Sequence, residues 1–353
     1  PAHKRWVLLA NWLDHSMIRN AVAFDIAHAI EYAVENHNLP QGIPWNVHGY
    51  SVELVVDGHH VGNYYLCEQI KIDEDRLNIK EPYDAEDNPG GFADCGYLLE
   101  FDMKEDNDIK YTTSNGVWVK FKNDEPKNSD VYKAVSEKIQ GIEDDLDNGN
   151  YTEAYNNLDI NSMVDQFLIW ELTMNREYGD PGSIYMFMDG NGKLSAGPVW
   201  DFDRGTFQNQ EKATNLGNST SYRVKPDNAW MFQRSQESEA YSYVWYRQLA
   251  KDATFRKTVV ERWAVIRPYL DMVVELIGEY GENQAISYKY NSVMWPTNKA
   301  DITKYKSDFK DWSGDELLGA DGNYQEVIDN FVTVYQERLA GMDGLIEAWK
   351  EAE

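Results

Sequence analysis

The sequence predicts an α+β fold in which antiparallel strands are followed by a mostly helical C-terminal half. Between residues 51 and 121, apolar residues alternate with polar ones, and turn-forming residues separate the runs. From about residue 130 onward, apolar residues recur at four-residue spacing, which is close to the period of a helix. The chain has 353 residues, of which 42% are hydrophobic, so it can bury one large core or two ordinary ones.

The first 70 residues are predicted to contain a helix and a β-hairpin. An early apolar run is followed by a polar turn, and Asp14 or Ser16 of that turn could cap the helix that begins behind it. The helix itself is predicted by apolar residues at Ile18, Val22, Ile26 and Ile30. Residues 51–70 alternate on both sides of Asp57-Gly58, a dipeptide typical of tight hairpin turns.

The rest of the chain is predicted to contain further strands and then helices. The expected elements are strands over 96–101 and 117–121, helices over 131–139 and 160–174, a hairpin over 184–200 with a Gly-rich turn, and mostly helices over 240–350. Residues 204–235 form a long polar stretch without a regular period, and loops of this length are often functional.

The charge balance limits the possible partners. The sequence has 33 basic and 60 acidic residues, a formal net charge of −27, which repels nucleic acids and anionic membranes. No run approaches the ~20 apolar residues that span a bilayer. Because the chain begins at Pro1, we expect N-terminal residues to be missing; a lost signal peptide would favour the cell envelope or the exterior, and otherwise the cytoplasm is expected. The two cysteines, Cys67 and Cys95, are expected to be buried thiols rather than a disulfide.

Two aspartates behind the second hairpin are the strongest chemical signal in the sequence. In an extended segment, Asp201 and Asp203 would point to the same side and could reach one hard cation. Mg²⁺ suits such a site, because it takes oxygen ligands and leaves room for substrate phosphates. The alternative is that one aspartate caps a turn and the other is solvated. The flanking Trp200 and Phe202 favour the metal site, because carboxylates in apolar surroundings need a partner.

A second candidate cluster lies in the loop over residues 175–183, between a predicted buried helix and the second hairpin. Glu177 and Asp180 supply carboxylates, Asn175 an amide and Ser183 a hydroxyl, which are the parts of a general base and a further metal ligand. The alternative is an ordinary polar loop in which Asp180 starts a turn.

Glu68 is an acid among apolar residues on the second strand of the first hairpin. If it is buried it needs a partner, and Arg19, Lys71 and Arg76 are all candidates. The alternative is a strand residue that faces water.

Several common catalytic signatures are absent from the sequence. It contains no GxxxxGK[ST] loop, no GxGxxG after a strand, no GxSxG elbow and no HExxH helix. P-loop and Rossmann nucleotide sites, serine hydrolases and zincin proteases are therefore not supported.

The order of several separated motifs resembles the CotH family, named for spore coat protein H. The resemblance spans roughly residues 4–270 and rests on Trp6-Val7-Leu8-Leu9-Ala10-Asn11, Asp14, Arg19-Asn20, Val52-Glu53-Leu54, Asp57-Gly58, Gly62-Asn63-Tyr64-Tyr65-Leu66, Glu68-Gln69-Ile70, Gly96-Tyr97-Leu98-Leu99-Glu100, the loop from Asn175 to Ser183, and Gly197-Pro198-Val199-Trp200-Asp201-Phe202-Asp203.

This resemblance implies an atypical kinase with a distant similarity to protein kinases in fold. Such a protein transfers the γ-phosphate of ATP to a protein substrate and uses Mg²⁺ or Mn²⁺. Asp201 and Asp203 then correspond to the metal-binding pair, and Glu177 or Asp180 to the catalytic acid. The residues expected to bind the nucleotide are Arg19, Glu68, Asn175 and Ser183. One CotH-like unit is expected, with an α+β lobe over 1–125 that is incomplete and a mostly helical lobe over 126–353.

The sequence departs from the family pattern at the catalytic loop. The family usually has an Asp followed a few residues later by Asn, whereas this chain has Glu177 or Asp180 and then Ser183. A shift of about 1 Å in a catalytic group can cost ~10²-fold in rate. A second hypothesis is therefore an impaired pseudokinase, or a cell-envelope protein that binds carbohydrate or protein on the same scaffold. A metal-dependent hydrolase or phosphatase is a third, weaker one, because a fuller ligand set is missing.

Overall fold

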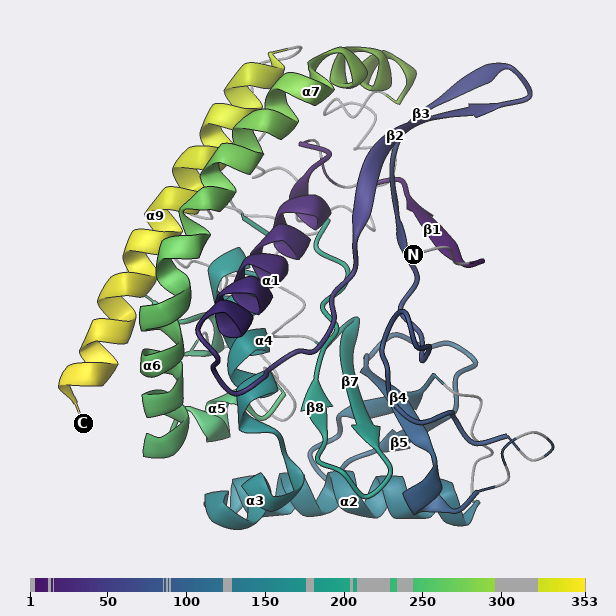
Figure 1. Cartoon of the computed structure of the whole chain (residues 1–353), viewed down its shortest axis with the longest axis vertical. Helices are drawn as coiled ribbons and strands as arrows, with labels where there is room; N and C mark the ends of the chain where they lie inside the picture. Colours follow the sequence, from purple (N-terminus) through teal and green to yellow (C-terminus); the bar gives the residue numbers. More distant parts are fainter. Residues whose placement is uncertain are drawn as a thin grey trace, which may run out of the picture.

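The structure is a computed structural model that describes residues 4–11, 14, 16–84, 86, 88, 90–122, 129–175, 181–203, 206–207, 229–233, 244–295 and 323–352. Two antiparallel sheets and a set of helices make up the described part, which confirms the predicted α+β class with a helical C-terminal half (Figure 1). The elements are arranged in layers. The helices α6, α7 and α9 lie along one side, α1 and α4 lie in the middle, and the sheets lie on the other side.

The smaller sheet contains the first predicted hairpin. Its strands are β1 (Trp6–Leu9), β3 (His59–Glu68) and β2 (Gly49–Val56), in that order. Asp57 and Gly58 connect β2 to β3, and their φ angles of 51° and 80° are those of a tight hairpin turn, as predicted.

The helix α1 (Arg19–Asn36) packs against this sheet, and the rings of Phe24 and Tyr65 are 6.0 Å apart. Its N-cap residue is Ile18, which makes no side-chain cap bond, so neither Asp14 nor Ser16 occupies the N-cap position, and both act from the turn in front of the helix. Asp14 Oδ2 accepts a hydrogen bond from the backbone N–H of Arg19 at 2.7 Å, and Ser16 Oγ accepts one from that of Ile18 at 3.4 Å.

The larger sheet has the strand order β5-β6-β4-β7-β8. Its strands are β4 (Gly96–Phe101), β5 (Lys110–Thr112), β6 (Trp118–Phe121), β7 (Ile184–Asp189) and β8 (Ser195–Ala196). The strands expected over 96–101 and 117–121 and the second hairpin are confirmed, although β8 is shorter than expected and β5 was not predicted. Every residue of β4 is buried, since helices and neighbouring strands cover the centre of the sheet.

Helices dominate from residue 130 onward, as the four-residue spacing predicted. They are α2 (Asp130–Asp147), α3 (Tyr151–Asn157), α4 (Ile160–Thr173), α5 (Tyr246–Leu249), α6 (Ala253–Leu270), α7 (Met272–Met294) and α9 (Tyr324–Glu351). The helix α7 ends at Met294, with Trp295 as its C-cap residue. The helix α4 is the buried one, and its Phe167 packs against the rings of Trp230, Phe232, Tyr246, Phe255 and Trp349.

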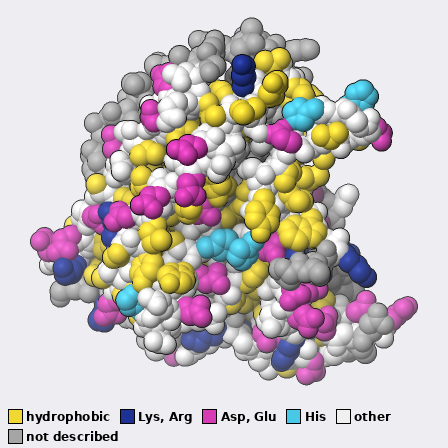
Figure 2. All heavy atoms as spheres, turned by 45° about the horizontal axis from the view of Figure 1, so that its top comes forward, with side chains coloured by type: hydrophobic (Ala, Val, Ile, Leu, Met, Phe, Trp, Pro, Cys, Tyr) yellow, Lys and Arg dark blue, Asp and Glu magenta, His cyan; other side chains and the backbone are white. Residues whose placement is uncertain are grey.

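The charge of the surface and the state of the two cysteines follow the expectations from the sequence. Figure 2 shows acidic side chains spread over one face of the molecule, with fewer basic ones among them. Cys67 and Cys95 are buried free thiols, as expected, and burial raises the pKa of Cys67 to about 12. Within the described ranges, no helix has the length and apolar character needed to cross a bilayer.

Candidate functional site

The two aspartates lie in a turn that leaves the larger sheet after β8. Gly197 starts this turn with a φ of 100°, and a Cβ there would lie 2.7 Å from Cγ2 of Ile43, so only glycine fits. Asp201 also has a positive φ, 64°. The chain is therefore not extended at Asp201, and the expectation of an extended segment there was wrong. A left-handed residue redirects the chain between Asp201 and Asp203.

The peptide between the two aspartates is held by buried amides from the start of the chain. The N–H of Phe202 donates to Asn20 Oδ1 at 2.7 Å, and Asn20 Nδ2 donates to Asn11 Oδ1 at 2.9 Å. Asn11 Nδ2 in turn donates to the carbonyl of Met17 at 3.1 Å. We refer to Asn11, Asn20 and the Phe202 peptide as the amide relay. Since these groups are buried, breaking one bond would leave its partner unsatisfied away from water.

The surroundings of the turn are apolar, as the flanking aromatic residues predicted. Phe202 is fully buried, and its ring centroid lies 6.4 Å from that of Phe24 and 6.3 Å from that of Trp170. Asp201 and Asp203 are both half-buried. The turn therefore places two carboxylates at the border between an aromatic core and the solvent.

Ser183 and Asn175 are the two residues of the predicted catalytic loop that the structure describes. Ser183 immediately precedes β7, and its hydroxyl donates to Asp201 Oδ2 at 3.2 Å. Asn175 is buried just after α4, whose Thr173 carbonyl accepts a hydrogen bond from the N–H of Phe207 at 2.8 Å. The end of α4 and the segment that follows Asp203 are thus joined. The two proposed catalytic acids, Glu177 and Asp180, lie outside the described residues.

A charged cluster next to Asp201 was not predicted. Glu100 and Tyr185 face each other across β4 and β7, and Lys122 Nζ lies 2.9 Å from Glu100 Oε2 and 2.6 Å from Asp108 Oδ2. Burial raises the pKa of Tyr185, and the charges of Glu100 and Asp201 add to this effect. Burial opposes the charge of Lys122, but its hydrogen bonds to Asp108 and Glu100 outweigh this and raise its pKa. The only sequence signal was a charged residue, Glu100, inside an apolar strand.

Arg19, a predicted nucleotide-binding residue, is fully buried at the first turn of α1. Its Nη1 lies 3.4 Å from Asp14 Oδ1, and along the chain Arg19 directly precedes Asn20 of the amide relay. Arg19 therefore joins Asp14 to the first turn of α1, next to Asn20 of the amide relay.

Glu68 is buried at the end of β3 and its partner is Arg76, one of the three candidates. Arg76 Nη1 lies 2.8 Å from Glu68 Oε1, and the backbone N–H and the ring of His48 lie 3.0 and 3.2 Å from Glu68 Oε2. The alternative of a water-facing strand residue is wrong, because Glu68 is only 1% exposed. Its contacts join β3 to Arg76 and His48; among the described residues they do not include Asp201 or Asp203.

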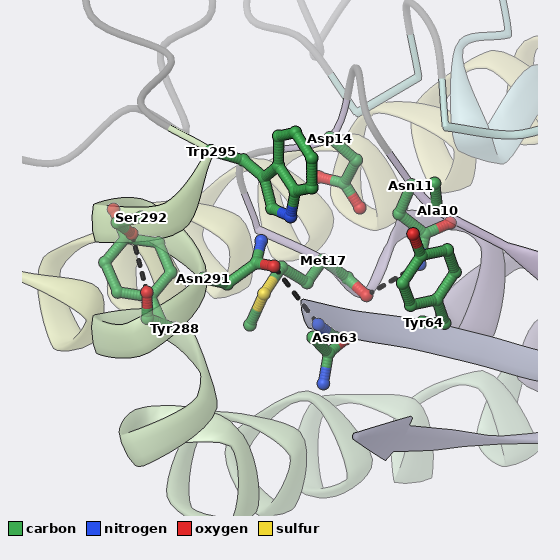
Figure 3. A pocket seen from close by; sticks show the side chains of 10 residues that line it. All are labelled: Ala10, Asn11, Asp14, Met17, Asn63, Tyr64, Tyr288, Asn291, Ser292 and Trp295. Carbon is green, nitrogen blue, oxygen red and sulfur yellow. Dashed lines mark hydrogen bonds between the residues drawn. The ribbon is translucent and has the colours of Figure 1, made fainter. Parts of the chain in front are cut away.

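A cavity of about 220 Å³ is lined in part by Asn11 of the amide relay (Figure 3). Asn11 lines it together with Ala10, Asp14, Met17, Asn63, Tyr64, Tyr288, Asn291, Ser292 and Trp295. The cavity therefore lies between the early turn, the strand β3 and the last turns of α7.

The donor set around Asp201 fits a hard divalent cation bound together with a phosphate ligand. No group of three or more His, Cys, Asp or Glu residues able to hold a metal occurs within the described part of the chain. Asp201 Oδ2 and the hydroxyl of Ser183, 3.2 Å apart, nevertheless supply oxygen atoms from one small region, and Asp203 follows two residues later in the chain. Mg²⁺ usually takes only one or two protein carboxylates and completes its shell with phosphates and water, so this set is sufficient in kind.

The fold and this turn define an α+β protein with an oxygen-rich candidate cation site. The family model described as "CotH kinase protein" matches residues 2–342, so the chain belongs to the CotH family. This membership supports a kinase-like function in general terms. Among curated proteins, no match was found.

Proposed function

We propose that this chain is a kinase that transfers the γ-phosphate of ATP to a protein, with Asp201 and Asp203 as the metal-binding residues. The proposal is supported by membership of the CotH family and by one structural observation. The amide relay fixes the peptide between the two aspartates, so their backbone is already in place before any ligand binds. Preorganised charges of this kind are the main contribution of a protein to phosphoryl transfer.

The residues have separate roles in this proposal. Asp201 and Asp203 hold Mg²⁺ or Mn²⁺, which neutralises phosphate charge when bound. Ser183 and Asn175, close to the same turn and to the end of α4, position the phosphates. The carboxylate that accepts the proton of the attacking hydroxyl is Glu177 or Asp180, as the resemblance implies.

Arg19 and Glu68 support the nucleotide site from further away. Arg19 does so through Asp14 and the early turn, and Glu68 through its ion pair with Arg76. The protein-kinase-like fold and its two lobes, over 1–125 and 126–353, belong to the same proposal. Strands β4 and β7 come from the two lobes and pair directly, so the lobes would share a sheet.

The test is phosphate transfer from γ-labelled ATP to the chain itself and to dephosphorylated casein, with Mg²⁺ or Mn²⁺. Asp201→Asn keeps the shape and tolerates the positive φ, because Asn adopts this conformation readily. We expect a loss of at least about a hundredfold in rate. Absence of transfer by the unaltered chain, or equal transfer by Asp201→Asn, would contradict the proposal.

The matched control is Asp57→Asn. Asp57 is also an aspartate at positive φ, 51°, but it lies in the exposed turn between β2 and β3. The same chemical change at this position is expected to leave the transfer rate unaltered.

The hypothesis of an impaired kinase is favoured by one observation at Ser183. Ser183 stands where the family usually has Asn, and its hydroxyl donates to Asp201 rather than offering a second carbonyl-type ligand. The φ of Ser183 is 54°, a conformation that Asn tolerates well, so Ser183→Asn should fold normally. A tenfold or larger gain in transfer would show impairment; an unchanged or lower rate would rule it out.

A further inference from the structure

We propose that the cavity lined by Asn11, Asn291 and Trp295 binds a neutral sugar ring, at a site separate from the phosphate-transfer site. The cavity lies between β3, the early turn and the end of α7, and none of its described lining residues is Asp201 or Asp203 (Figure 3). Its volume is about 220 Å³. Pockets that enclose a drug-sized ligand have roughly 300–1,000 Å³, so this one suits a single ring.

The charges of the lining favour a neutral ligand. Asp14 is the one acidic side chain among the described lining residues, and Lys and Arg are absent from that set. Asp14 is already engaged, since its Oδ1 accepts the N–H of Ser16 at 2.8 Å and its Oδ2 that of Arg19 at 2.7 Å. An anion would find no opposite charge here and would also be repelled by the net charge of −27.

The aromatic side chains form a fixed wall for the face of a ring. Trp295 is 52% exposed, yet its Nε1 donates to the carbonyl of Val61 at 2.8 Å, so the indole is held in place. Tyr288 is stacked on Tyr324 with the ring centroids 4.4 Å apart. The apolar C–H face of a sugar packs well on such a surface, because Trp and Tyr combine a large apolar area with a polar group.

Gly62 allows this wall to form. Its φ is 129°, and a Cβ there would lie 2.7 Å from Asn291 Oδ1 and 3.0 Å from Trp295 Nε1. The strand β3 can therefore approach the end of α7 closely only at a glycine.

Amide and hydroxyl groups supply the hydrogen bonds that sugar hydroxyls need. Asn291 Oδ1 accepts the backbone N–H of Asn63 at 3.1 Å, which leaves its amide nitrogen as a donor toward the cavity (Figure 3). Ser292 Oγ donates to the carbonyl of Tyr288 at 2.6 Å and retains its acceptor lone pairs. Donors and acceptors in neutral groups, next to an aromatic wall, match a hydroxylated ring.

The experiment is saturation-transfer difference NMR of the full chain with methyl glycosides of glucose, galactose, mannose and N-acetylglucosamine, and with adenosine as a separate arm. We expect transfer to at least one glycoside, with weak affinity. Trp295→Ala should weaken the binding about tenfold or more, because truncation of a central aromatic anchor removes most of the contact. Asn291→Asp keeps the acceptor for Asn63 but removes the donor, and it should also weaken binding.

Two controls make the result specific. Tyr290→Ala removes an aromatic side chain of the same helix that is 60% exposed and does not line the cavity, so glycoside binding should persist. Asp201→Asn should leave glycoside binding intact, which separates this site from the phosphate-transfer site. The proposal is overturned if no glycoside shows transfer, if Trp295→Ala binds the glycoside as tightly as the unaltered chain, or if only adenosine binds in a Trp295-dependent way.

Discussion

The acids of α4 and the acids of the Asp201 turn are satisfied in different ways. On α4, Asp165 binds Arg262 through both oxygens, at 2.7 and 2.9 Å, and Glu171 Oε2 lies 3.0 Å from Arg338 Nη2. Both helix acids are buried. Asp201, in contrast, is half-buried and is contacted by the hydroxyl of Ser183, with no ion pair to a described Lys or Arg.

This difference separates structural acids from candidate functional ones. A buried acid that is paired with arginine and also accepts backbone N–H groups has its charge and most of its lone pairs engaged, so little remains for a ligand. An acid that meets only a hydroxyl keeps lone pairs for a cation. We therefore expect loss of an α4 ion pair to lower the stability strongly and ligand binding little. We expect substitution of Asp201 to lower ligand binding strongly and the stability little.

The largest loss of stability is expected from Arg262→Met. This change leaves the buried Asp165 carboxylate without its counter-charge, and burial already raises the pKa of that acid. Removing one partner of a buried pair costs about 3–5 kcal/mol, which urea denaturation would measure as a lower midpoint.

Lys257→Met on the same helix is the matched control. Lys257 pairs with Glu261, but both side chains are about 60% exposed (60% and 63%). Such a pair contributes about 0–1 kcal/mol, so the midpoint should barely move. Similar losses from both variants would show that burial does not distinguish the two pairs.

Asp25 and His28, one turn apart on α1, should produce opposite pH dependences of stability. Burial raises the pKa of Asp25 from 3.8 to about 6, against the hydrogen bond from Tyr280. Burial, followed by the charge of His48, lowers the pKa of His28 from 6.5 to about 4. The folded state therefore binds a proton at Asp25 more tightly than the unfolded state does, and at His28 less tightly.

Each pKa shift changes the free energy of unfolding by roughly 3 kcal/mol between about pH 4 and pH 6. The stability that Asp25 contributes is present below pH 4 and is lost as the pH rises to 6. The stability that His28 contributes is gained over the same range. The two should nearly cancel in the unaltered chain. Asp25→Asn should leave stability rising with pH, and His28→Gln should leave it falling. Denaturation at pH 4, 5 and 6 checks this, and parallel curves for the two variants would refute it.

Loss of the amide relay should have an intermediate effect. Asn20→Ala leaves the buried N–H of Phe202 and the Oδ1 of Asn11 without their partner, at a cost of about 1–3 kcal/mol. Asn20→Asp keeps the acceptor for Phe202 and is the informative comparison. Hydrogen exchange of the Phe202 amide should accelerate in the alanine variant and much less in the aspartate variant. Equal protection in both would mean that Asn20 does not hold the turn.

The amide relay also shows what a single sequence can and cannot predict. The strands and helices follow from local periodicity, so β2, β3, β4 and α4 were predicted close to their observed bounds. The hydrogen bond between Asn20 and Phe202 joins positions 182 residues apart, and no local pattern encodes it. The positive φ of Asp201 lies directly before this distant contact, in a segment whose local sequence pattern predicted an extended strand.

The smallest stability change, and the sharpest contrast with α4, is expected for Asp201→Asn. Without an ion pair to break, the substitution should alter the free energy of unfolding by no more than about 1 kcal/mol. Its effect should appear only with ligand: ATP plus Mn²⁺ should raise the thermal midpoint of the unaltered chain, because ligand bound to the native state stabilises it by mass action. The midpoint of Asp201→Asn should not respond, and chelation of the metal should bring the two proteins to the same midpoint. An equal ligand-induced rise in both would place the nucleotide elsewhere and would show that an acid without an arginine partner is not, by itself, a sign of a metal site.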